Sequence, residues 1–133
     1  NIGSGLKTIS THCFEGCTAI QYLVIPETVE VIDDYAFYNC TNMTTLVLRS
    51  GVKKINYKAF TNCLNKGTDS NGKNIARVYF EGAASKWNSS DISIDASNWM
   101  YLTMYADLYF YSETDPGSGN YWRFVDGVAT PYR

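Results

Sequence analysis

Residues 6–63 contain the stretch of sequence that decides the fold, and they repeat one motif three times. The motif reads LKTISTHCFEGCTAIQYLVIPET at residues 6–28, VEVIDDYAFYNCTNMTTLVLRSG at residues 29–51 and VKKINYKAFTNC at residues 52–63. Four apolar positions recur every 23 residues: Leu6, Val29 and Val52; Ile9, Ile32 and Ile55; Phe14, Phe37 and Phe60; Cys17, Cys40 and Cys63. This period predicts a repeat solenoid, because a single unit cannot bury its own apolar face and neighbouring units must stack.

The third unit is interrupted after Cys63 by an insertion near residues 64–73. The strand pattern of residues 43–48 next recurs at residues 75–80, an offset of 32 residues instead of 23. The inserted residues read LNKGTDSNGK. Their Gly, Asn, Asp and Ser content predicts a surface loop.

Each unit combines two patterns of different period. Ile20, Leu23 and Ile25 end in alternation, which predicts a strand with one buried face. The segment that contains Phe37 and Cys40 has a spacing closer to that of a short helical turn. Stacked units bring their strands together in a parallel sheet, about 4.8 Å apart. We therefore expect ladders of Phe on Phe and Cys on Cys in the core.

The repeat resembles the BspA-type (Treponema-like) leucine-rich repeat over roughly residues 5–82, through the motif Phe14-Glu-Gly-Cys17-x-x-Ile20-x-x-Leu23-x-Ile25-Pro26-x-x-Val29-x-x-Ile32. The resemblance implies a curved, right-handed coil with a parallel β-sheet and short helical turns. The family is found mostly in cell-surface and secreted proteins of bacteria and some protists. Its members are associated with adhesion and with binding host proteins or neighbouring cells. The sequence departs from the family pattern at Arg49, which replaces the Pro at the strand end, and at Cys13, which replaces Ala.

The first unit begins partway through a repeat, at Leu6, without the strand that precedes this position in the pattern. A solenoid end without a cap exposes its core. We expect this chain to be the C-terminal part of a longer array, with an apolar N-terminal edge that pairs between molecules. We also expect the signal peptide and the anchor to lie outside this segment.

Residues 83–133 lack the repeat and are predicted to form a β-rich, aromatic C-terminal cap. They contain 11 aromatic residues, against 9 in residues 1–82, which we assign to the repeats. The pattern predicts a helical turn at 83–88, strands at 101–111 and 121–125, a turn at 115–120 and a short extended end at 128–132. We expect this segment to cover the last coil and to blunt the exposed strand edge.

The three tryptophans, all in this segment, give it a second interpretation. Sugar-binding sites use exposed aromatic side chains as platforms, and the candidates are Trp87, Trp99 and Trp122. Burial of these rings would exclude the interpretation, because a ligand has to reach its platform.

Four cysteines and one histidine are the candidates for metal or redox chemistry. Cys17, Cys40 and Cys63 share one repeat position and are predicted to be buried and apolar, as free cysteines usually are. One disulfide between stacked coils stays open on distance grounds, although parallel Cβ vectors oppose it. Because His12 and Cys13 lack a second histidine or a Cys-x-x-Cys pair, we predict no metal and no cofactor.

The remaining features argue against several classes of function. No nucleophile elbow, P-loop or HExxH motif is present, so we predict that the chain is not an enzyme. The net charge is −2, from 11 basic and 13 acidic residues, without the basic excess of a nucleic-acid-binding protein. No apolar run reaches the ~18–20 residues of a membrane span. We therefore expect no nucleic-acid partner and no membrane insertion by this segment.

The candidate binding surface is the open face of the predicted sheet. Alternation places Leu23 and Leu46 inside, so that their neighbours along the strands point outward. The outward positions that align across the coils are Tyr22, Thr45 and Arg77; Val24, Val47 and Tyr79; and Arg49 and Glu81. Tyr and Arg are enriched at the strongest contacts of protein interfaces, although Val and Tyr also favour strands in general.

Together these features predict a non-enzymatic, extracellular protein-interaction or adhesion module of a bacterial surface or secreted protein. The expected partner is a protein of a host or of a neighbouring cell, bound through the open sheet face. Two alternatives stay open: glycan binding through the aromatic residues of the cap, and a structural spacer within a larger surface protein.

Overall fold

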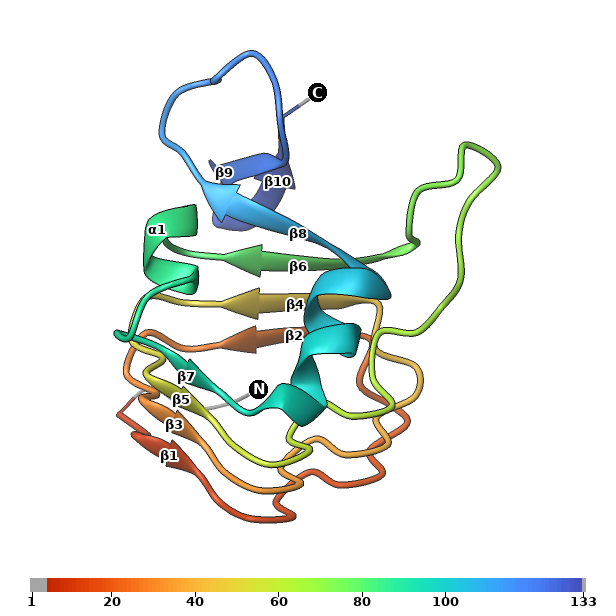
Figure 1. Ribbon diagram of the computed structural model, residues 1–133, viewed down its shortest axis with the longest axis vertical. Helices are drawn as coiled ribbons and strands as arrows, with labels where there is room; N and C mark the ends of the chain where they lie inside the picture. The colour runs from red at the N-terminus through yellow and green to blue at the C-terminus, as the bar shows by residue number, and fades with distance from the viewer. Residues whose placement is uncertain (1–4, 133) are drawn as a thin grey trace.

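Short and long strands alternate along the chain and form two sheets that enclose a common core (Figure 1). The computed structural model describes residues 5–132. The four-stranded sheet has the order β1 (Thr8–Ile9), β3 (Val31–Ile32), β5 (Lys54–Ile55), β7 (Ser93–Ile94). The six-stranded sheet has the order β10 (Val128–Pro131), β9 (Tyr121–Val125), β8 (Ala106–Tyr111), β6 (Ala76–Phe80), β4 (Thr45–Leu48), β2 (Tyr22–Ile25).

Successive coils pair in the register that the sequence period predicts. Ile9 lies opposite Ile32, and Tyr22 lies opposite Thr45. The insertion changes only the numbering of the next pair, in which Thr45 lies opposite Arg77. Leu64, the first inserted residue, is fully buried in the core, so the surface-loop prediction is wrong for it, and the residues after it leave the body of the molecule as a long loop (Figure 1). The pairing from β2 to β8 is parallel throughout, as a repeat solenoid requires.

The predicted phenylalanine and cysteine ladders run through the core. The ring centroids of Phe14 and Phe37 lie 5.2 Å apart and those of Phe37 and Phe60 lie 5.3 Å apart, with the rings within 6° of parallel. The thiol of Cys40 donates a hydrogen bond to the carbonyl oxygen of Phe14 (3.2 Å), and the thiol of Cys63 donates to that of Phe37 (2.9 Å). Equal steps in sequence therefore give equal heights in the stack, and both ladder predictions are confirmed.

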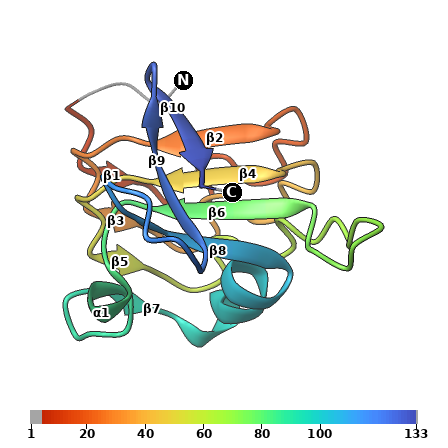
Figure 2. The ribbon, with the colours of Figure 1, turned by 90° about the horizontal axis from the view of Figure 1, so that it is seen from above.

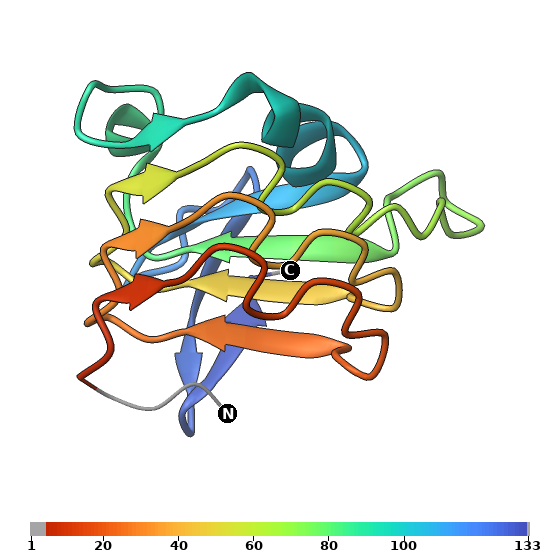
Figure 3. The ribbon, with the colours of Figure 1, turned by 90° about the horizontal axis from the view of Figure 1, so that it is seen from below.

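The segments predicted as short helical turns are runs of tight turns. The N–H of Ala36, for example, donates to the carbonyl oxygen of Asp33, three residues earlier. The residue just before Ala36, Tyr35, adopts a left-handed backbone with φ of 57°, and so do its equivalents in the other coils, His12 (60°) and Lys58 (53°). A left-handed residue interrupts helical geometry, so the chain turns a corner at the same place in each coil. Figure 3 shows these corners following one another from coil to coil, coloured from red through orange to yellow.

Beyond Gly82 the coil continues with a different spacing. Ile94 of β7 lies opposite Ile55, and Phe110 of β8 lies opposite Phe80. The parallel pairing of strands therefore continues beyond Gly82, the residue at which the 23-residue repeat ends in the sequence. The connections are short helices: α1 (Ala84–Trp87), a 3₁₀-helix (Ala96–Asn98) and a π-helix (Met100–Met104).

Several predicted elements of this C-terminal segment are present. The helical turn at 83–88 is α1, the strand at 121–125 is β9, and the extended end is β10. The strand predicted at 101–111 begins only at Ala106, because residues 100–104 are helical. Tyr101, one of the aromatic residues that suggest a strand there, instead contacts the last repeat, where its hydroxyl donates to Oδ1 of Asn62 (3.1 Å).

Backbone hydrogen bonds also join the turn segments of successive coils, and this ladder ends on a side chain. In the stack, the N–H of Phe37 donates to the carbonyl oxygen of Ala59 in the next coil (2.9 Å). The N–H of Phe60 donates instead to Oδ1 of Asn98 (2.9 Å), whose Nδ2 donates to the carbonyl oxygen of Asn56 (2.8 Å). Asn98 is fully buried. Its amide therefore replaces a carbonyl group that a further coil would supply, and it satisfies a buried donor.

The hairpin of β9 and β10 crosses the outer face of the six-stranded sheet (Figure 2). β9 pairs with β8 over only two residue pairs and then with β10 in antiparallel fashion. Trp122 anchors the hairpin: its side chain is fully buried and its indole N–H donates to the carbonyl oxygen of Phe80 (2.9 Å). Around it lies a second apolar cluster, made of Val47, Tyr79, Tyr109 and Ala129.

Candidate functional site

The hairpin covers the middle of the predicted binding face. Val47 and Tyr79 point outward from the sheet, as alternation predicts, but they are only 1% and 4% exposed. Trp122 packs on both of them, with its ring centroid 5.5 Å from that of Tyr79. The prediction that these two residues form an accessible surface is therefore wrong.

Arg49 and Glu81 are also engaged within the molecule. Nε of Arg49 donates to a carboxylate oxygen of Glu81 (2.7 Å), and both side chains are half-buried. The guanidinium of Arg49 lies 4.6 Å from the ring centroid of Phe124 in the hairpin. The hydrogen bond to Glu81 raises the pKa of Arg49. These two predicted contact residues thus interact with one another and with the hairpin, and each is only partly accessible to a partner.

Three of the predicted residues lie in a row that the hairpin leaves uncovered, and we call Tyr22, Thr45 and Arg77 the open row. They lie side by side at the beginnings of β2, β4 and along β6. Tyr22 is 50% exposed, Arg77 is exposed and Thr45 is half-buried. Val24, which follows on β2, is also exposed. The accessible part of the predicted face is therefore one edge of it.

The guanidinium of Arg77 is held in place by two aromatic side chains. Nη1 of Arg77 donates to the hydroxyl oxygen of Tyr79 (3.3 Å), and the guanidinium carbon lies 5.8 Å from the ring centroid of Tyr109. The bond to Tyr79 raises the pKa of Arg77. The side chain is thus a positively charged group in a defined position at the surface, with donors left for a partner.

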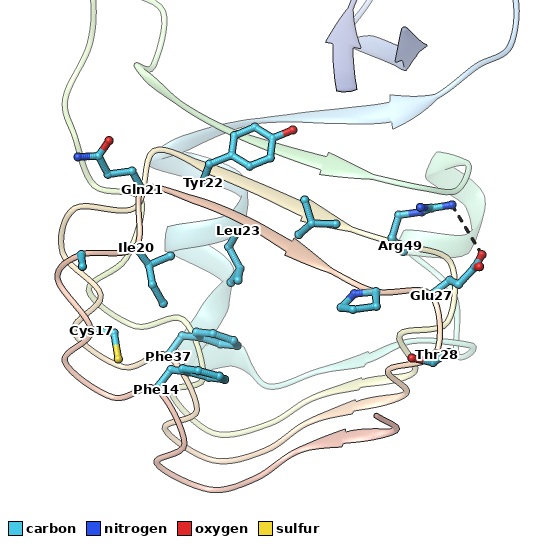
Figure 4. Close-up of a pocket in the computed structure, with 13 residues that line it drawn as sticks. Phe14, Cys17, Ile20, Gln21, Tyr22, Leu23, Glu27, Thr28, Phe37 and Arg49 are labelled. Atoms are coloured by element: carbon cyan, nitrogen blue, oxygen red, sulfur yellow. Dashed lines mark ion pairs between the residues drawn. The ribbon is translucent and has the colours of Figure 1, made fainter. Parts of the chain in front are cut away.

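A groove of about 870 Å³ lies at the free edge of β2. Figure 4 shows Phe14, Phe37, Ile20 and Leu23 facing it on the core side of the strand, while Tyr22 projects on the other side. An ion pair between Arg49 and Glu27 (3.6 Å) lies at its far end. Within the residues that the structure describes, the groove is an end of the core that no strand covers.

The tryptophans do not form an exposed platform together. Trp122 is fully buried and Trp87 is 3% exposed, so the prediction of an accessible sugar-binding ring is wrong for both. They are buried because each one fills the core beside Phe80 or the hairpin. Trp99 is half-buried and packs edge-on against Trp87, with ring centroids 6.0 Å apart. Only Trp99 stays accessible to a ligand.

The four cysteines are free thiols. Cys40 and Cys63 are buried in the core, Cys17 is half-buried and Cys13 is exposed, so the one disulfide left open by the sequence is not formed. Hydrogen bonding to Cys40, together with burial, raises the pKa of the Cys63 thiol, which keeps it protonated and unreactive. Within residues 5–132, no group of three or more His, Cys, Asp or Glu side chains is placed to hold a metal ion.

In the same described part of the chain, no helix has the length and apolar character needed to cross a membrane. Comparison with curated proteins and with solved structures gave no match. Comparison with protein families matched residues 1–97 to the BspA type leucine rich repeat region. This match covers the predicted repeats, continues through β7 and ends within the 3₁₀-helix Ala96–Asn98. It agrees with the parallel pairing that continues beyond Gly82. The chain belongs to the BspA-type leucine-rich repeat family.

Proposed function

We propose that this chain is a non-enzymatic, extracellular protein-interaction module of a bacterial surface or secreted protein. Its partner is a protein of a host or of a neighbouring cell, and it binds through the open row of Tyr22, Thr45 and Arg77. The observation that carries the proposal is the exposure of this row, in contrast to the covered centre of the same face. Repeat families of this kind bind partners through extended preformed surfaces.

The chemistry of the open row suits a protein partner. Tyr22 offers a large exposed ring, and Arg77 offers directed hydrogen bonds from a positioned guanidinium. These two residue types dominate the strongest contacts of interfaces. Because Arg77 is already held by Tyr79, less side-chain freedom is lost when a partner binds. An acidic side chain of the partner is the natural complement of Arg77.

We also propose that the coil is right-handed and that residues 83–133 form its aromatic cap. This segment adds the last strands, ends the hydrogen-bond ladder on Asn98 and lays the hairpin over the sheet. By covering Val47 and Tyr79 it removes apolar area from the face, so that binding depends on the polar and aromatic groups of the open row.

The test is a surface-binding assay of the chain against purified host extracellular proteins and against whole bacterial cells. We expect the double variant Tyr22→Ala, Arg77→Ala to lose binding by at least about tenfold, as truncation of two strong contacts does. Tyr57→Ala is the matched control, because Tyr57 is 45% exposed and lies on the corner side of the coil, away from the open row. Equal affinity of the double variant and the parent chain would contradict the proposal.

Two alternatives make different predictions in the same assay. A structural spacer binds none of the proteins, cells or glycans offered. A module that binds only glycans binds polysaccharide but none of the proteins, and the Tyr22→Ala, Arg77→Ala double variant keeps its full affinity; of the three candidate rings, such binding depends on Trp99, which is the accessible one.

A further inference from the structure

A pocket of about 490 Å³ lies at the opposite end of the four-stranded sheet from β1, beside its outermost strand β7. It is formed by the loop after α1, by β7 and by the ring of Trp99. No residue of its lining carries a charge. The pocket is therefore suited to a neutral ligand, because an ion would find no counter-charge there.

The backbone of β7 presents an unused donor and an unused acceptor at this pocket. The N–H of Ser93 donates to the carbonyl oxygen of Lys53 and that of Asp95 to the carbonyl oxygen of Ile55 (both 2.8 Å). In a parallel strand the residue between two such donors faces the other way. The N–H and C=O of Ile94, which lines the pocket, therefore point away from β5. In the described part of the chain, no strand pairs with β7 on that side.

Uncharged side chains add to this hydrogen-bonding capacity. Ser90 and Ser93 line the pocket, are exposed, and have no side-chain hydrogen bond to any residue in the range 5–132. Asn88 uses its Nδ2 to hold the carbonyl oxygen of Ala84 (3.1 Å), which leaves its Oδ1 as an acceptor. The pocket thus combines donors and acceptors at close spacing.

The ring of Trp99 supplies the apolar part of the same pocket. It is half-buried and is held nearly perpendicular (87°) to Trp87, which in turn packs at 5.0 Å on Phe80 of the core. This support fixes the orientation of the ring before a ligand arrives. Trp87 also lines the pocket, and its buried indole N–H has no acceptor among the described residues. A fixed indole face next to uncharged polar groups matches a ligand that has both an apolar face and hydroxyl groups.

We propose that this pocket binds a neutral sugar residue, with Trp99 against the apolar face of the sugar ring and with Ser90, Ser93 and the backbone of Ile94 bonding its hydroxyl groups. The site is separate from the open row: it lies beside β7 of the four-stranded sheet, whereas the open row lies on the six-stranded sheet. A protein partner on the open row and a sugar in this pocket are therefore independent of one another.

The test titrates the whole chain with glucose, galactose, mannose and N-acetylglucosamine while tryptophan fluorescence is followed. We expect a saturable change with at least one of these sugars at concentrations up to about 10 mM. We expect Trp99→Ala to weaken this binding by at least about tenfold and Trp99→Phe, which keeps an aromatic ring, to weaken it less. Arg77→Ala is the control and should leave sugar binding unchanged, since Arg77 belongs to the open row.

A second variant keeps the test decisive if Trp99→Ala fails to fold. Ser90→Ala combined with Ser93→Val removes both free hydroxyls, while valine suits a strand. We expect this double variant to keep the far-ultraviolet circular dichroism of the parent and to bind the sugar about tenfold more weakly. The proposal is overturned if none of the four sugars gives a saturable change, or if the double serine variant binds as tightly as the parent.

Discussion

The repeats and the C-terminal segment build the same core with different contacts. In the repeats, identical rings lie parallel: Phe14, Phe37 and Phe60 stack at 5.2–5.3 Å and within 6°. In the C-terminal segment several rings meet edge to face, as Trp87 does with Trp99 (87°) and Tyr111 with Trp122 (79°). Parallel stacking follows from the translation of one unit onto the next. Where the residues differ in shape and no unit is repeated, the rings adopt the edge-to-face geometry, which aromatic pairs also favour.

The acceptors of the backbone hydrogen bonds between coils also differ between the repeats and the C-terminal segment. Within the repeats, the N–H of Tyr35 donates to the backbone carbonyl oxygen of Tyr57 in the next coil (2.9 Å). At the equivalent position of the last repeat, the N–H of Lys58 donates to the hydroxyl oxygen of Ser97 (2.8 Å), just as Phe60 donates to Asn98. Each repeat therefore needs a neighbouring coil to accept hydrogen bonds from its backbone N–H groups. At the last repeat, side chains of the C-terminal segment are these acceptors.

The largest expected effect comes from breaking the parallel stack at its centre. Phe37 is fully buried between two rings, so Phe37→Ala should lower the free energy of unfolding by ~3–5 kcal/mol. Phe14→Ala is the matched control: its ring is half-buried at the open end, and the loss should be about 1 kcal/mol. Urea unfolding followed by circular dichroism measures both. Equal losses at the two positions would show that the rings do not form one ladder.

The next effect concerns the hairpin. Trp122→Ala should lower the free energy of unfolding by about 3 kcal/mol, because it removes a fully buried indole. It should also detach the hairpin from Val47 and Tyr79, so that a hydrophobic dye binds the variant but not the parent. Trp122→Phe retains an aromatic ring and should keep the face covered. Parent-like dye binding and stability of Trp122→Ala would contradict the role of this residue as the anchor.

A smaller effect is expected where the two regions join. Asn98→Ala leaves the buried N–H of Phe60 without an acceptor and should cost about 2 kcal/mol. The matched control is Asn65→Ala, because Asn65 is an exposed asparagine whose side chain has no hydrogen bond to any residue in the range 5–132. Thermal unfolding of the two variants distinguishes them. If both lose the same amount, Asn98 does not end the ladder.

The smallest effect is a pH dependence at the same junction. Hydrogen bonds from the hydroxyl and then the backbone of Ser97 lower the pKa of Asp95. A carboxylate whose pKa is lower in the folded state stabilises the fold above its unfolded pKa, near pH 4, and loses this contribution as pH falls through the folded value. The stability difference between the parent and Asp95→Asn should therefore be largest at neutral pH and shrink below about pH 4. A difference that grows on acidification would reverse the expected sign.

The sequence predicts the repeats well because their structure follows from periodicity. The register of Ile9 with Ile32 and the ladders at Phe37 and Cys40 need only the rule that equal positions stack. Coverage of Val47 and Tyr79 could not be derived in this way, since it depends on where the nonrepeating Trp122 docks. A weak signal exists: β4 reads TLVL and β6 reads ARVYF, and such near-continuous apolar runs are typical of strands buried on both faces.

The candidate site likewise combines features that the sequence predicts with features that it does not. Tyr22 and Arg77 are exposed as alternation predicts, because the hairpin packs on Val47 and Tyr79 instead. The pocket at Trp99 is only partly predictable: its ring is a candidate, but its polar groups come from the loop after α1, which has no counterpart in the repeats, and from β7, which continues the four-stranded sheet without the 23-residue step.

Amide hydrogen exchange resolved at single residues tests most directly whether side chains of the C-terminal segment complete the backbone ladder. The amides of Phe37 and Phe60 have acceptors of different kinds, the carbonyl group of Ala59 and the side chain of Asn98. We predict that both exchange slowly in the parent chain, and that in Asn98→Ala the exchange of Phe60 accelerates far more than that of Phe37. Rapid exchange at Phe60 in the parent, beside a protected Phe37, would contradict the account.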